Sequence, residues 1–78
     1  MDALKENIEN SMRRRIVEIE AEIIQIMDLP KPTKMDAELV TAKLRLIKNI
    51  AHDLNEDHLY FAVRSRVLEI CRKNMLPV

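Results

Sequence analysis

Glycine is absent from the 78 residues of this chain. Phosphate-cradling loops, dinucleotide-binding turns and the tight hairpins of many β proteins need a residue that adopts positive φ, and glycine does so at no steric cost. The sequence therefore excludes the P-loop and the dinucleotide-binding fingerprint, and it argues against a β fold.

Cysteine occurs once, at Cys71, so no intramolecular disulfide can form. With only two histidines the chain has no zinc-ligand spacing, and we expect neither a metal nor another cofactor. A chain this short buries only about 60% of its unfolded surface, so its stability must come from close helix packing or from oligomerisation. The polar N-terminus lacks the pattern of a secretory signal, and a lone cysteine suits a reducing compartment, so we expect a cytoplasmic protein.

Charge of one sign is not in excess, because basic and acidic residues number 13 each. Dedicated nucleic-acid binders usually carry a basic surplus. Aromatic residues are nearly missing, since Tyr60 and Phe61 are the only ones, and proteins that bind single strands need stacking platforms. The longest run of purely apolar side chains spans residues 61–63, against about 20 for a membrane-spanning helix, so we expect no membrane partner.

What the chain does have is helical periodicity. In the first third, apolar residues recur in steps of three and four, which only a helix places on one face. These residues are Leu4, Ile8, Met12, Ile16, Ile19, Ile23 and Ile26. Two further segments show the same spacing, and in the second of them Leu39, Leu46 and Ile50 broaden the apolar face. We predict one all-α domain over residues 1–78. It is a small bundle of about three helices, residues 2–27, 34–54 and 56–73, in which the long first helix overhangs the hairpin of the other two.

Three local patterns set the predicted helix boundaries. Pro30 and Pro32 end the first helix, because proline cannot donate to the helical ladder. Thr33 precedes Asp36 by three residues, which resembles a capping box at the start of the second helix. Asn55 is expected to cap the third helix, and the alternative is one kinked helix over residues 34–73. The apolar tail, residues 74–78, is expected to end the third helix.

Apolar residues make up 47% of the chain, which is high for so few residues. We expect that one copy cannot hide all of this surface, and that a second copy or another protein covers the rest. The isoleucine-rich seam of the first helix is the predicted contact surface, and it comprises Met12, Ile16, Ile19, Ile23 and Ile26. The predicted function is that of a non-catalytic adaptor, inhibitor or regulator acting as a homodimer, a build common among small phage and mobile-element proteins.

A run of arginines suggests an alternative function. Arg13, Arg14 and Arg15 form the densest charge run, and third-helix arginines at Arg64 and Arg66 would extend it if the two helices are adjacent. Such a surface would contact phosphate, and the chain would then be a nucleic-acid-binding regulator. The simpler interpretation is a solvated face with local ion pairs from Arg14 and Arg15 to Glu18. No residues form a credible catalytic set, so we do not expect an enzyme.

Overall fold

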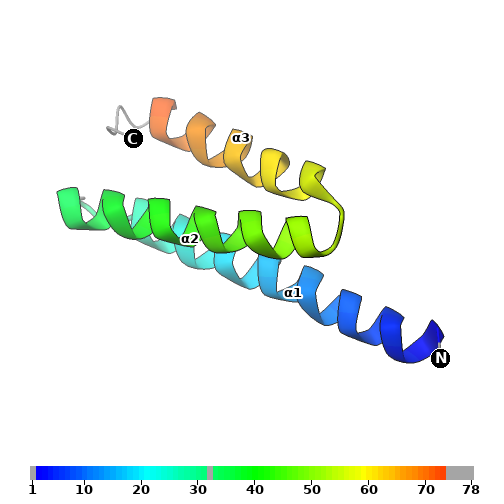
Figure 1. The fold of residues 1–78 in the computed structure, drawn as a ribbon. Coiled ribbons are helices and arrows are strands. Elements are labelled where there is room, and N and C mark those ends of the chain that lie inside the picture. Colours follow the sequence, from blue (N-terminus) through cyan, green and yellow to red (C-terminus); the bar gives the residue numbers. More distant parts are fainter. Residues whose placement is uncertain (1, 32, 74–78) are drawn as a thin grey trace.

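The computed structural model describes residues 2–31 and 33–73, which form three helices and no strand (Figure 1). They are α1 (Asp2–Met27), α2 (Lys34–Asp53) and α3 (Asp57–Lys73). The predicted all-α class and number of helices are confirmed, and the alternative of one kinked helix through residues 34–73 is wrong. The predictions made for Pro32 and for the tail, residues 74–78, fall outside the described residues.

The three helices run up, down and up, so that α2 is antiparallel to both of its neighbours and α1 is parallel to α3 (Figure 1). The molecule is a rod with principal extents of 48 × 17 × 16 Å. At 26 residues, α1 is longer than α2 and α3, which have 20 and 17. Its N-terminal end therefore extends past the turn that joins α2 to α3, and it lies alone there (Figure 1).

The start of α2 is fixed by the predicted capping box. The Thr33 hydroxyl accepts a hydrogen bond from the Asp36 backbone N–H at 3.2 Å, and the Asp36 carboxylate accepts one from the Thr33 N–H at 2.8 Å. These bonds satisfy backbone donors that a helix N-terminus otherwise leaves without partners. The aspartate side chain reaches as well as the more usual glutamate, and the prediction is confirmed.

The turn between α2 and α3 corrects the prediction for Asn55. This residue has a φ of 60°, and its N–H bonds the carbonyl of His52, while the next N–H, of Glu56, bonds the carbonyl of Ala51. That pair of bonds is the Schellman motif, which ends a helix with a residue in the left-handed region. Asn55 therefore terminates α2 and does not cap α3. Asparagine serves here because, after glycine, it tolerates this conformation best.

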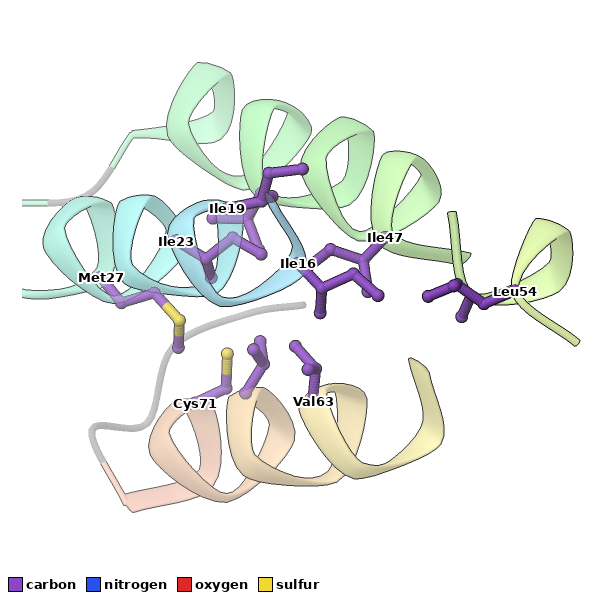
Figure 2. Packing of buried hydrophobic residues seen from close by; sticks show 11 residues of the cluster. Ile16, Ile19, Ile23, Met27, Ile47, Leu54, Val63 and Cys71 are labelled. Atoms are coloured by element: carbon purple, nitrogen blue, oxygen red, sulfur yellow. The ribbon is translucent and has the colours of Figure 1, made fainter. Parts of the chain in front are cut away.

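The core lies along the middle of the rod, where all three helices meet (Figure 2). Each helix contributes residues at the spacing of one face, and the fully buried side chains are aliphatic. The core residues are Ile16, Ile19, Ile23 and Met27 of α1, Val40, Ile47, Ala51 and Leu54 of α2 with its C-cap, and Val63, Val67 and Cys71 of α3.

The core also corrects the predicted contact surface. Ile16, Ile19 and Ile23 are at most 4% exposed because α2 and α3 of the same chain cover them. Met12 and Ile26 are half-buried and pack against the same core. The isoleucine seam is thus buried by helices of the same chain. A partner would have to contact other apolar side chains.

Candidate interaction surface

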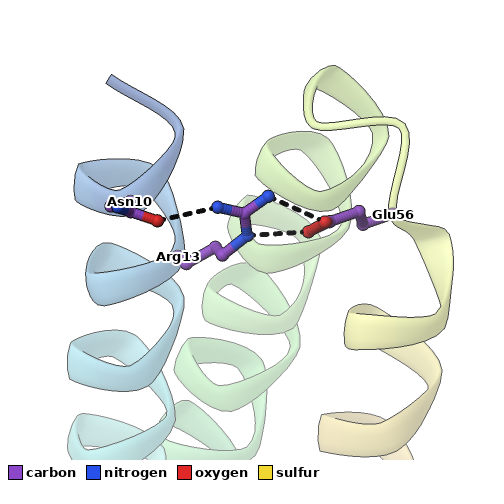
Figure 3. Close-up of polar contacts among 3 residues, drawn as sticks. All are labelled: Asn10, Arg13 and Glu56. Carbon is purple, nitrogen blue, oxygen red and sulfur yellow. Dashed lines mark hydrogen bonds and ion pairs between the residues drawn. The ribbon is translucent and has the colours of Figure 1, made fainter. Parts of the chain in front are cut away.

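Arginine–carboxylate pairs join α1 to α3. The Arg13 guanidinium donates from Nε to Oε1 of Glu56 and from Nη2 to Oε2, both at 2.9 Å, and a third bond from Nη1 reaches Asn10 at 2.8 Å (Figure 3). This bidentate geometry is the one that arginine forms best with a carboxylate. The hydrogen bond from Arg13 lowers the pKa of Glu56 below its usual value. Glu56, the residue just before α3, is thereby fixed to the side of α1.

A second such pair lies about two turns further along α1 and nearly three turns further along α3. Arg66 of α3 donates to both carboxylate oxygens of Glu20, at 2.6 and 2.9 Å, and the bond raises the pKa of Arg66. Arg15 lies within 3.7 Å of both Glu18 and Glu22 on its own helix. The predicted pair of Arg15 with Glu18 is therefore present.

These ion pairs involve most of the arginines that were predicted to contact phosphate. The structure brings the two helices together as that hypothesis requires, but Arg13, Arg15 and Arg66 each face a carboxylate. Only Arg14 and Arg64 of the five have no ion pair within the described residues. Two cations on different helices leave little of the predicted anion surface.

Exposed apolar side chains follow a stripe of α2 that borders α1. Leu39 and Leu46 are 45% and 48% exposed, and Ile50 is half-buried. Together with Lys43 they step by four, three and four residues, so they share one side of the helix. Lys43 donates to Glu22 of α1 at 2.8 Å, which places the whole stripe along the α1 edge and lowers the pKa of Glu22.

The stripe continues on the free end of α1. Ile8, Arg15 and Glu22 are seven residues apart, so they lie along one side of α1, and Glu22 fixes that side next to α2. Ile8 is 55% exposed and Leu4, one turn earlier, is 68% exposed, because α2 has ended before their level. We call the set Leu4, Ile8, Leu39, Leu46 and Ile50 the apolar strip.

The strip was not predicted as a surface, although Leu39, Leu46 and Ile50 were expected to broaden the apolar face of their helix. A helix with apolar residues on more than one stripe needs more than one neighbour, and that signal was present. What local spacing does not reveal is which stripe the chain's own helices cover. Here they cover the isoleucine seam and leave Leu4, Ile8, Leu39 and Leu46 exposed, while Ile50 packs partly against the core.

The remaining candidate residues lie away from the strip. An open groove of about 340 Å³ between α2 and α3 is lined by Lys48, Asn49, His52, Asp57, Tyr60 and Phe61. Both histidines are exposed, and His52 Nδ1 lies 3.6 Å from Asp57 Oδ1. Within residues 2–31 and 33–73, no group of three or more histidine, cysteine or acidic side chains is arranged to hold a metal ion.

Cys71 lies in the core. Burial raises the pKa of its thiol, so less of the reactive thiolate is present at neutral pH. A structural role fits this environment better than a nucleophilic one.

Comparison with known proteins does not indicate a family or a function for this chain. No family model matches the chain, no curated protein is significantly similar to it, and no solved structure matches its fold at the same standard. None of the helices within the described residues has the length and apolar content needed to cross a bilayer.

Proposed function

We propose that this chain is a non-catalytic protein–protein interaction module, a small adaptor, inhibitor or regulator that works as a homodimer through its apolar strip. The supporting observation is the strip, in which Leu4, Ile8, Leu39 and Leu46 are exposed on one side of α1 and α2. Large exposed apolar patches are typical of contact sites.

The total surface area agrees with this proposal. The chain exposes 5993 Å², whereas a compact monomer of 9.2 kDa exposes about 4,900 Å². The difference is about 1,100 Å², and a stable protein interface buries about 800 Å² on each partner. An elongated chain exceeds the area of a compact one of the same mass, and the excess here is large enough to accommodate one ordinary interface.

Sedimentation velocity from 1 to 100 µM tests the proposal. We expect the wild-type chain to dimerise in this range and the Leu39→Glu, Leu46→Glu double variant to stay monomeric with unchanged helical circular dichroism. The matched control is Phe61→Glu, which changes a side chain that is equally exposed but lies on α3. A wild-type chain that remains monomeric throughout, or a double variant that dimerises as well as the control, would count against the strip.

The nucleic-acid alternative has its own test. Replacing Arg13 or Arg15 would also remove an intramolecular ion pair, so Arg14→Ala with Arg64→Ala is the cleaner variant. A gel-shift assay at low salt with the wild-type chain should show no association with duplex DNA or RNA. Salt-sensitive binding that the double variant abolishes would establish the alternative.

A further inference from the structure

The groove between α2 and α3 combines aromatic and charged side chains from both helices. It has a volume of about 340 Å³ next to the turn that joins them, which is at the small end of ligand pockets, about 300 to 1,000 Å³. Lysine, asparagine and histidine line it from α2, and aspartate, tyrosine and phenylalanine line it from α3. The groove therefore has room for a short stretch of a ligand and offers it both apolar and polar contacts.

The apolar part of the groove is an aromatic pair. The ring centroids of Tyr60 and Phe61 are 5.2 Å apart, and the two ring planes are inclined by 60°. Tyr60 is half-buried, whereas Phe61 is 58% exposed, and exposed aromatic side chains are enriched at protein contact sites. Rings arranged edge to face do not offer the parallel platforms on which successive bases of a nucleic-acid strand stack. The pair is better suited to one apolar anchor side chain of a protein partner.

Basic residues border the groove on both helices. Lys48 lines it directly. Arg45 is three residues before Lys48, and Arg64 is three residues after Phe61. Residues three apart in a helix are neighbours on its surface, so both arginines flank the groove. None of these three cations has an ion pair within the part of the chain that the structure describes.

Asp57 is the only carboxylate among the side chains that line the groove, and it faces a histidine. Its Oδ1 lies 3.6 Å from Nδ1 of His52. The groove and its flanks thus hold three cations against one carboxylate, in a chain whose formal charge is zero. Opposite potentials favour association and select partners, so this local basic excess favours an acidic ligand.

We propose that this groove binds a short acidic peptide segment of another protein, with one aromatic anchor side chain against Phe61 and carboxylates facing the three cations. The amide of Asn49 can both donate to and accept from the peptide backbone. The apolar strip lies on the side of α2 that borders α1, as the bond from Lys43 to Glu22 shows, so the groove is a separate surface. The proposal does not depend on the homodimer.

A titration followed by ¹⁵N–¹H NMR tests the groove with a defined probe. The probe is a seven-residue peptide, blocked at both ends, in which glutamates and aspartates surround a central phenylalanine. At low salt we expect saturable shifts by 2 mM peptide, largest in the second half of α2 and the first half of α3. The same peptide with serine in place of phenylalanine should bind at least tenfold more weakly, because anchors dominate such contacts. No saturable shift, or equal binding of the two peptides, would overturn the proposal.

Matched charge reversals separate the groove from the overall charge of the chain. Lys48→Glu with Arg64→Glu should weaken peptide binding at least tenfold. Lys5→Glu with Arg14→Glu makes the same change in net charge at exposed positions of α1 and should leave the dissociation constant within twofold. Circular dichroism checks that both double variants keep the wild-type helicity. Equal weakening by the two pairs would show unspecific attraction and would contradict a site in the groove.

Other occupants of the groove give different results. An oligothymidylate that shifts the same residues and binds as tightly as the peptide would make nucleic acid the ligand. A Phe61→Glu variant that no longer dimerises would place a second copy there. Either result would overturn the peptide proposal. The Leu39→Glu, Leu46→Glu variant should bind the peptide like the wild type, so the groove and the homodimer succeed or fail separately.

Discussion

Arg13 of α1 and Glu56, the residue just before α3, are 43 residues apart in sequence, yet their side chains form two parallel hydrogen bonds of 2.9 Å. The pair connects the first helix to the last at the level where the α2–α3 turn ends. The residues of α1 that precede this level extend beyond the other two helices (Figure 1). This pair and that of Arg66 with Glu20 join α1 to α3 at two levels.

The first prediction concerns the pH dependence that this pair confers. Arg13 lowers the pKa of Glu56 in the folded state, so the pair stabilises the fold above the usual carboxylate pKa near 4.5. That contribution is lost as the pH falls through the lower, folded-state pKa. We expect Glu56→Gln to lower the melting temperature at pH 7 and to have no effect near pH 2.5, as followed by circular dichroism.

Glu69→Gln is the control for that experiment, since Glu69 is exposed and has no ion pair among the described residues. Its melting temperature should follow that of the wild type at every pH. A Glu56→Gln variant that keeps the same deficit at pH 2.5 would show that the pair does not supply the effect.

The second prediction compares two adjacent isoleucines. Ile23 is fully buried and Ile24 is 36% exposed. Ile23→Ala should cost about 2–5 kcal/mol of unfolding free energy, because it removes apolar contact and leaves a cavity in the core. Ile24→Ala should cost less than about 1 kcal/mol. Urea unfolding at 25 °C measures both, and equal losses at the two positions would contradict the packing described.

The third prediction concerns the left-handed residue of the α2–α3 turn. A residue with a Cβ pays a steric cost at positive φ that glycine avoids and asparagine partly avoids. Asn55→Ala should therefore destabilise the fold by about 1 kcal/mol, whereas Asn55→Gly should leave it unchanged or slightly more stable. Asn49→Ala, at an exposed position inside α2, is the control and should not destabilise. An alanine at position 55 that is as stable as glycine would rule out the left-handed conformation.

The fourth prediction concerns the thiol of Cys71. Because burial raises its pKa and shields its sulfur, an aromatic disulfide reagent should modify it at least a hundredfold more slowly in the native chain than in 8 M urea. The native rate should rise when the core is weakened by Ile23→Ala. Ser65→Cys in a Cys71→Ser background places a thiol at an exposed α3 position and should react at the unfolded rate. Fast labelling of native Cys71 would contradict its burial.

Much of this fold follows from the sequence, because the signals for it are local. Steps of three and four residues define each helix, and Thr33 with Asp36 marks the start of α2 within a single turn of chain. The role of Asn55 was missed because asparagine favours both the start of a helix and the left-handed residue that ends one. Only the backbone angle separates the two.

The surface was harder to predict than the helices. Periodicity identifies an apolar face but does not say which neighbour covers it, so the isoleucine seam was assigned to a partner although α2 and α3 fill it. The pairs of Arg13 with Glu56 and of Arg66 with Glu20 have no local signal, since they depend on the register between distant helices. The strip became visible once that register was known.

The elongated shape affects how the molecule moves through solution. A rod 48 Å long and 17 by 16 Å across meets more friction than a sphere of the same volume, so a single chain migrates through a porous matrix like a heavier globule.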